Sequence, residues 1–368
     1  MFYLGLRNKV HTVLFITVCC SPNIIQAFEP VYPSSQLIKK VKFILSSKVT
    51  EAPGSDNWPL TWGKDDHQYT SWGDGGGFSG TNEDGRVSLG FGRIENDVDK
   101  YRGVNIWGGK NSLNPATFEG KNIGIIDIDS TLYAWRNGAS SNVGAFDKTE
   151  LYVSHNQAAN FIYTGISFTP TTFANAPKIY SPTFLQFGKG YSNTKDDYVY
   201  IYAPENITGT WDVQKPGRIF LMRSKKNNLE KQHLYEYFNG TDSNGLPRWT
   251  TDTTKLKPVF EDPANGVMRT SVTYNAGLQR YILTTQQVSR YKKYYGHIGV
   301  YEAPEPWGPW STVLFANAWK TGLQTGKKSV FWNFSNKWAS FDGKKFVMVY
   351  TDNDEFALIK GEFILHEK

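Results

Sequence analysis

Short apolar runs, broken by Gly, Asn and Asp, follow one another along most of the chain. Several runs alternate apolar and polar residues with a period of two, which is typical of half-buried β-strands. No stretch keeps apolar residues at helical spacing for three turns. The pattern therefore predicts an all-β protein. The clearest predicted strands are 68–72, 124–128, 131–135, 198–202, 218–223, 267–274, 280–285, 297–301 and 345–350.

A polar turn followed by a strand that carries Tyr, Trp or Phe recurs along the chain at intervals of about 60 to 80 residues. This is the spacing of propeller blades with loop insertions, in which each copy joins the innermost strand of a blade to its second strand. Residues 154–161 also resemble a degraded S-x-D-x-G-x-T-W turn of sialidase-like propellers. The pattern predicts a five-bladed β-propeller. The five copies are 66–69, 129–133, 196–200, 277–281 and 342–346.

The first 27 residues have the pattern of an export signal. Arg7 and Lys9 precede an apolar stretch, 10–20, that is too short to span a bilayer, and Ala27 ends an A-x-A-like cleavage site. We expect 1–27 to be a signal peptide, 28–54 a lead-in that helps close the ring, and 55–368 the propeller. The protein is then secreted or periplasmic, a monomer, and without an integral membrane segment after signal removal.

Composition narrows the functional classes. Both cysteines, Cys19 and Cys20, lie in the leader, so the mature chain has no disulfide or thiolate site. The net charge of +6 is spread along the chain, so nucleic acid is not an expected partner. The G-x-G-x-x-G at 75–80 precedes a loop and not a helix, and the six His are scattered, so we expect neither a cofactor nor a metal. The aromatic content of 15% fits sugar-stacking surfaces as well as sheet packing.

The segment 55–75 predicts a β-hairpin that carries two candidate catalytic residues. A turn centred near Asp65 pairs residues whose numbers sum to about 130, which sets Asp56 opposite Asp74. Opposed acids repel, so their presence calls for a function. Glycoside hydrolysis needs one protonated and one ionised carboxyl, and neighbouring like charges separate two pKa values in that way. The alternative is that Asp56 caps a turn and Asp74 belongs to an ordinary Asp-Gly turn.

Further residues are candidates for binding a sugar chain. Trp58 and Trp62 crowd the same hairpin and can stack against a sugar ring. Arg269 lies on a predicted inner strand of the fourth blade and can bind hydroxyls, although a structural ion pair is an equal alternative. A third acid from the second blade, Asp127 or Asp129, is also considered. The remaining candidates are Gln186 and Lys189 in blade three and Trp332 and Lys337 in blade five.

The hairpin resembles a known family. The segments Asp56-Asn57-Trp58-Pro59 and Gly73-Asp74-Gly75 resemble the opening of domain of unknown function family 4185, and later segments agree, above all 303–310. The resemblance covers 56–361 and implies a five-bladed propeller. Some members are similar to endo-D-arabinanases of glycoside hydrolase family 183, whose implicated acids correspond to Asp56 and Asp74.

The sequence therefore predicts a secreted glycoside hydrolase that acts on a polysaccharide, such as an arabinan-type furanose polymer, through two Asp carboxylates. Two alternatives stay open. One is a propeller that binds carbohydrate without cleaving it, which needs the aromatic residues but not both acids. The other is a cell-surface adhesion module.

Overall fold

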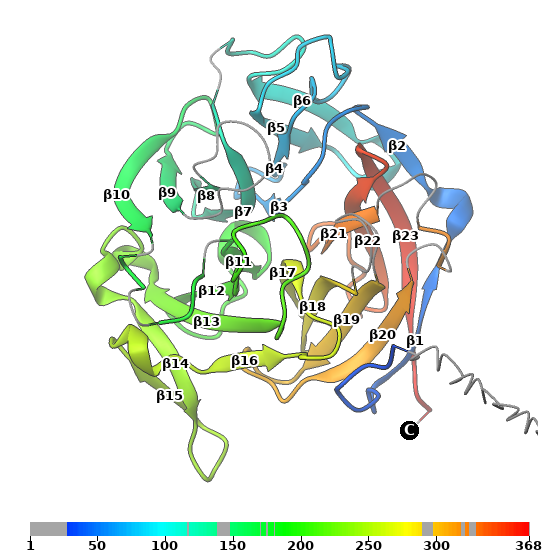
Figure 1. The fold of residues 1–368 in the computed structure, drawn as a ribbon. Coiled ribbons are helices and arrows are strands. Elements are labelled where there is room, and N and C mark those ends of the chain that lie inside the picture. Colours follow the sequence, from blue (N-terminus) through cyan, green and yellow to red (C-terminus); the bar gives the residue numbers. More distant parts are fainter. Residues whose placement is uncertain are drawn as a thin grey trace, which may run out of the picture.

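The computed structural model describes residues 28–367 except 116–117, 138–147, 170, 174–175, 180, 289–296, 318–320 and 324–328. The predicted signal peptide, 1–27, lies outside the described residues. The described strands form five antiparallel blades around a central axis (Figure 1). The protein is therefore an all-β, five-bladed propeller, and the prediction from the repeat is confirmed. No helix in the described part of the chain is long and apolar enough to cross a membrane.

The strands of each blade follow one another from the central axis outward. Blade one has β3 (Leu60–Trp62), β4 (Gln68–Gly73), β5 (Leu89–Glu95) and β6 (Arg102–Trp107), and blade two has β7 (Lys121–Ile128), β8 (Thr131–Asn137), β9 (Thr149–Ser154) and β10 (Ile162–Phe168). Blade three has β11 (Thr183–Gln186), β12 (Tyr198–Pro204) and β13 (Arg218–Lys225), with β14 (Glu236–Thr241), β15 (Pro247–Thr250) and β16 (Pro258–Glu261) outside them. Blade four has β17 (Met268–Asn275), β18 (Arg280–Gln287), β19 (His297–Ala303) and β20 (Ser311–Asn317). Blade five has β21 (Ser329–Phe334), β22 (Lys345–Asp352) and β23 (Glu355–Leu365), completed by β1 (Ile38–Phe43) and β2 (Val49–Glu51).

Short 3-10 helices interrupt the connections between strands. They are η1 (Leu45–Ser47), η2 (Val98–Lys100), η3 (Lys189–Tyr191), η4 (Lys226–Asn228), η5 (Gln232–Leu234) and η6 (Thr253–Lys255). The five repeat copies lie where the sequence placed them, at the connections β3–β4, β7–β8, β11–β12, β17–β18 and β21–β22.

The innermost strands share one direction, which gives the propeller two different faces. β11 and β17 pair in parallel and join blades three and four into one ten-stranded sheet. The beginnings of β7, β17 and β21 meet in one apolar cluster around Ile123, Met268 and Val330. We call this side the start face, and the side that carries the five repeat turns the end face.

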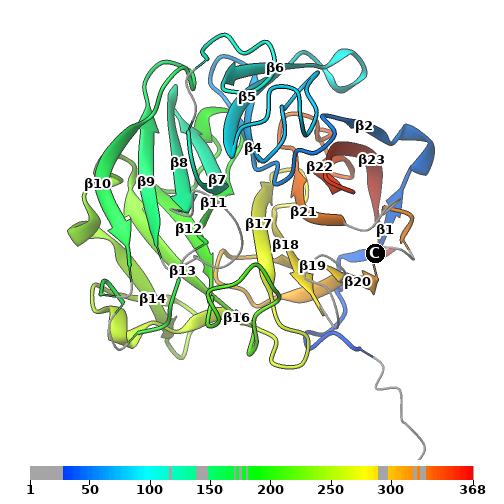
Figure 2. The ribbon, with the colours of Figure 1, turned by 45° about the horizontal axis from the view of Figure 1, so that its top comes forward.

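The lead-in segment 28–54 supplies the outer edge of blade five. β1 pairs antiparallel with β23, with Val41 opposite Phe363, and β2 pairs with the same strand, with Thr50 opposite Ala357. Figure 2 shows β1 and β2 in blue beside β23 in red. The ring is therefore closed by the two ends of the chain.

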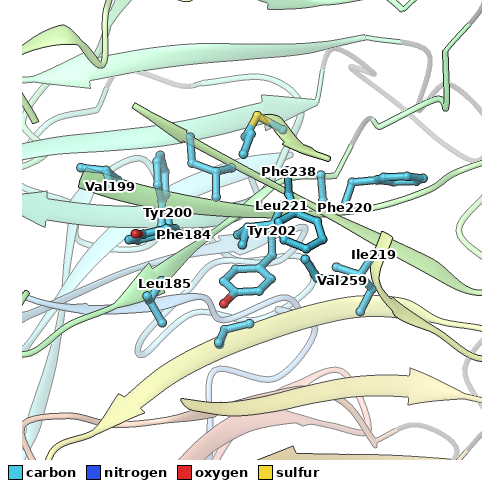
Figure 3. Close-up of a cluster of buried hydrophobic side chains, with 14 of the residues drawn as sticks. Phe184, Leu185, Val199, Tyr200, Tyr202, Ile219, Phe220, Leu221, Phe238 and Val259 are labelled. Carbon is cyan, nitrogen blue, oxygen red and sulfur yellow. The ribbon is translucent and has the colours of Figure 1, made fainter. Parts of the chain in front are cut away.

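Blade strands bury side chains on both sides because each blade packs between two neighbours. In the third blade, Phe184, Tyr202 and Leu221 from three successive strands lie within one buried cluster (Figure 3). All three side chains are at most 1% exposed. This explains why β12 and most of β13 are nearly continuous apolar runs.

Candidate functional site

The predicted hairpin register holds along the strands and changes at Asp56. Leu60 pairs with Thr70, as predicted, but Asp56 exchanges two backbone hydrogen bonds with Gly73, at 2.9 and 2.6 Å. One extra residue on the Asp56 side accounts for the shift, as in a β-bulge, and Asn57 there has a φ of 57°. The expected opposition of Asp56 and Asp74 is thus displaced by one residue, and Asp74 follows directly after Asp56's partner.

Asp56 and Asp74 nevertheless belong to one cluster on the start face. A Cβ at Gly73 would lie 3.0 Å from Asp56 Oδ1 and 2.9 Å from Lys121 Cδ, so both side chains lie directly against this glycine. Lys121 Nζ lies 2.7 Å from Asp74 Oδ1, and Arg86 approaches the same oxygen at 3.3 Å. Asp56 is partly exposed, and the Asp74 side chain is 42% exposed. Both residues are therefore partly exposed to solvent.

A buried polar relay supports Asp56 from behind. Asn57 Nδ2 donates to Asp56 Oδ1 at 2.8 Å, while Asn57 Oδ1 accepts from Arg269 Nε at 2.9 Å. Arg269 also donates to Gln286 Oε1 at 3.1 Å, and its guanidinium lies 5.0 Å from the centre of the Trp211 ring. Arg269 is only 2% exposed, so its described contacts are with protein groups. It reaches the site through Asn57.

Three residues of this face escaped the sequence analysis. Asn57 lies shortly before the inner strand β3, and Lys121, like Arg269, lies at the beginning of an inner strand. This shared side of the inner strands was the available signal. Trp211 comes from the β12–β13 connection and packs with Met268 and Phe331. No spacing relation links it to the carboxylates, so sequence alone gave no indication of it.

Trp58 and Trp332, predicted to contact sugar, lie in the protein interior. Both are 0% exposed. Trp58 stacks on Trp72 at 5.7 Å, and its ring nitrogen donates to the Ser55 carbonyl. Trp332 donates to Ser329 Oγ. Their large apolar rings stabilise the core, and neither offers an accessible face to a ligand in this structure.

The other four predicted binding residues lie at the end face, across the propeller from Asp56. Asp66 Oδ1 lies 3.0 Å from Lys189 Nζ and accepts from Trp62 Nε1 at 3.1 Å, and its other oxygen lies 3.4 Å from Lys337 Nζ. Gln186 donates to the Ile125 carbonyl at 2.9 Å. These side chains tie blades one, two, three and five together.

The charges of this network determine the state of Asp66. Burial acts to raise the pKa of the Asp66 carboxyl, but the hydrogen bonds from Lys189 and Trp62 and the positive charge of Lys337 outweigh it. The pKa therefore lies below the ordinary value of 3.8. Asp66 is a structural anion held between two cations.

The considered third acids also lie at the end face. Burial, with the nearby charges of Asp65 and Asp129, raises the pKa of Asp127 to about 6, although backbone N–H groups donate to its carboxylate. Asp129 pairs with Lys64 at 3.2 Å, and both side chains are exposed. Neither acid belongs to the cluster around Gly73.

The class of protein that fold and site define is a five-bladed propeller with two partly exposed acids at one mouth. Residues 134–325 match the family model described as Domain of unknown function (DUF4185), which is more than half of the chain. The chain belongs to this family. Asp56 and Asp74 precede the matched residues. No curated protein matches the sequence.

Several solved structures are distantly similar in fold. An endo-arabinase from Bacteroides thetaiotaomicron has a TM-score of 0.48 at 11% identity, covering 88% of this chain and 97% of that one. A GH43_1 enzyme from Xanthomonas citri complexed with xylose has a TM-score of 0.47 at 11% identity, covering 88% and 94%. A GH62 hydrolase in complex with xylotriose has a TM-score of 0.44 at 8% identity, covering 90% and 98%.

Proposed function

We propose that the protein is a glycoside hydrolase that cleaves a polysaccharide at the start face, with Asp56 and Asp74 as its two carboxyls. The observation that carries this proposal is their clustering with Lys121 around Gly73, where both residues remain partly exposed to solvent. Hydrolysis of a glycosidic bond needs one carboxyl to donate a proton and a second to act as base or nucleophile.

The remaining start-face groups support the same role. Lys121 and Arg86 contact one oxygen of Asp74, and the Asn57 amide donates to Asp56. The two carboxylates thus have different partners, which is what an acid and a base need if they are to carry different protonation states. Lys121 and Asn57 are positioning residues in this proposal.

The resemblance of the hairpin to family 4185, and through it to endo-D-arabinanases, makes an arabinan-type furanose polymer the first substrate to test. We also propose that the protein acts outside the cytoplasm, because 1–27 has the pattern of an export signal. A propeller that binds carbohydrate without cleaving it is the second candidate, because one mouth of the ring can bind glycan without turnover.

The experiment measures new reducing ends released from arabinan, xylan, galactan and arabinogalactan. We expect the wild type to cleave at least one polymer and Asp56→Asn and Asp74→Asn to lose a factor of about a hundred or more. The matched control is Asp84→Asn, an exposed acid of the same blade that pairs with Lys110, as Asp74 pairs with Lys121.

Full activity in both Asn variants would exclude these carboxyls as the catalytic pair. Binding of a glycan by all four proteins, without any release of product, would favour the binding propeller instead.

A further inference from the structure

A cavity of about 780 Å³ opens on the end face between blades four and five. Its walls are the β17–β18 turn and the segment that follows β21. Its described lining contains none of Asp56, Asp74 and Arg269, and lining residue Thr273 lies four residues along β17 from Arg269, which is about 13 Å of strand. The cavity is thus separate from the carboxylate cluster. Its lining includes Trp62, Asn275, Phe334, Asn336, Phe341, Asp342 and Phe346.

Aromatic rings form the floor and the rim of this cavity. Phe334 and Phe346 meet edge-on at the floor, with ring centres 4.9 Å apart. Phe341 stands at the rim with its whole side chain in water, at 103% exposure, and Trp62 at the wall is partly exposed. Covering a fully hydrated phenyl ring removes apolar surface from water, so a ring at the rim of a cavity lined by other aromatic rings suits a ligand with an apolar face.

The walls are fixed before any ligand arrives. Asn275 donates to the Gly343 carbonyl at 2.8 Å and accepts from Leu278 N, which joins the turns of blades four and five. Asn336 donates to the Tyr274 carbonyl at 2.9 Å and accepts from Gly188 N. Preformed walls reduce the entropy lost on binding.

The rim supplies polar groups for a hydroxylated ligand. Asp342 Oδ1 accepts from Ser340 Oγ at 2.6 Å and from Lys344 N, and its side chain is 57% exposed. Its carboxylate can accept further hydrogen bonds at the mouth. Volume, mostly apolar walls and a few polar rim groups are the ordinary features of a small-molecule site.

We infer that this cavity is a second, non-catalytic carbohydrate-binding site that takes a short segment of a neutral polysaccharide. The apolar face of a sugar ring stacks on Phe341, its edge meets Trp62, and a hydroxyl donates to Asp342. Lys344 Nζ lies 3.9 Å from Asp342 Oδ2, so the two charges offset each other at the rim, which suits a neutral chain. The site uses no group of the start face, so it does not depend on the proposed hydrolysis.

The test is affinity electrophoresis through gels that contain arabinan, xylan, galactan or arabinogalactan, with Asp74→Asn as the parent so that the polymer stays intact. We expect at least one polymer to retard the parent. Phe341→Ala should weaken the apparent binding constant about tenfold, and Phe341→Trp should preserve it. Tyr163→Ala is the matched control, because Tyr163 is an exposed aromatic residue on the outer strand β10.

Three outcomes would overturn the inference. The first is that no polymer retards the parent, and the second is that Phe341→Ala migrates as the parent does. The third is that Phe341→Ala changes the sedimentation coefficient, because the exposed ring would then contact a second copy of the chain. Since binding is scored without turnover, failure of the proposed hydrolysis leaves this result readable.

Discussion

The two faces of the propeller carry the same kinds of side chain in different arrangements. On the start face, Asp74 has Lys121 and Arg86 on one oxygen and remains open to solvent. On the end face, Asp66 is held between Lys189 and Lys337, which come from two other blades. Both carboxylates are exposed, and the difference lies in how their cations are placed. In the described part of the chain the cations at Asp74 lie on one oxygen, whereas each oxygen of Asp66 has its own lysine, at 3.0 and 3.4 Å.

The difference shows that residue type at the tip of an inner strand does not decide its role. Asp56 precedes β3 and Asp66 follows it. The side chains around each carboxylate distinguish a proposed catalytic role from a structural one. Changes on the start face should therefore affect rate more than stability. Changes in the end-face network should do the opposite. Two effects on rate and two on stability test that contrast, and within each pair the larger effect comes first.

Removing the Lys121 ammonium should have the largest effect on the rate of hydrolysis. Lys121→Met keeps the apolar stem of the side chain but removes its charge. Of the two described cations at Asp74 only Arg86 then remains, so the Asp74 carboxylate is held less firmly. We expect kcat/KM on the cleaved polymer to fall about tenfold or more, which corresponds to about 1.4 kcal/mol of transition-state stabilisation. The melting temperature should change little, and an equal loss of stability and rate would contradict the contrast.

The relay behind Asp56 should give a smaller effect on rate. Asn57→Gly tolerates the φ of 57° but removes the hydrogen bonds to Asp56 and Arg269. We expect kcat to fall severalfold with KM nearly unchanged, because an unsupported carboxylate is less well oriented. The acid limb of the rate–pH profile should move as well, whereas a purely structural role would leave the profile unchanged.

Replacing a buried acid of the end face should alter stability alone. The pKa of Asp127 is raised to about 6, so its protonated carboxyl stabilises the folded state. This contribution is fully present below pH ~4 and is lost as the pH rises through 6. The free energy of unfolding falls by at most ~3 kcal/mol over this range. Asp127→Asn keeps an oxygen for the N–H groups of Lys64 and Ser130. Thermal unfolding should show a higher midpoint for the variant at pH 7 and none of this gain near pH 4. A lower midpoint at pH 7 would show that the charge is useful.

The smallest effect should come from Asp66→Asn. Because the pKa of Asp66 is lowered in the folded protein, its carboxylate stabilises the folded state at pH values above the ordinary pKa of 3.8. This contribution is lost as the pH falls through the lower pKa of the folded state. The side chain is 55% exposed, so the loss at pH 7 should stay below about 1 kcal/mol. Hydrolysis should be unaffected. A drop in kcat would place the end face in the reaction.

The five repeat turns were enough to predict the fold from the sequence. Each turn joins an inner strand to the second strand of its blade, so five turns indicate five blades. Turn chemistry also gave the register of β3 and β4, with Trp62 opposite Gln68. It could not give the extra residue at Asn57, because a bulge depends on the backbone conformation of one residue. That single residue displaced Asp56 from Asp74.

The sequence predicted part of the start-face cluster but grouped it with residues that lie on the end face. From sequence alone, Trp58 and Trp332 fit a sugar-stacking surface and the protein core equally well. Only their burial in the structure shows that they belong to the core. Lys189 was grouped with Asp56 although it follows an inner strand and Asp56 precedes one. Because inner strands are parallel, these positions lie at opposite mouths, a rule that needs no coordinates once the blades are assigned.

The pairing of β1 with β23 has a consequence for how the chain reaches this state. Ile38 and Leu365 must meet, so the first strand of the ring cannot find its partner until the last one has been synthesised. Contacts this distant in sequence slow folding, and until they form β23 presents an unpaired edge that invites association with other chains. The pairing of β1 with β23 is therefore among the last contacts that the ring can form during synthesis.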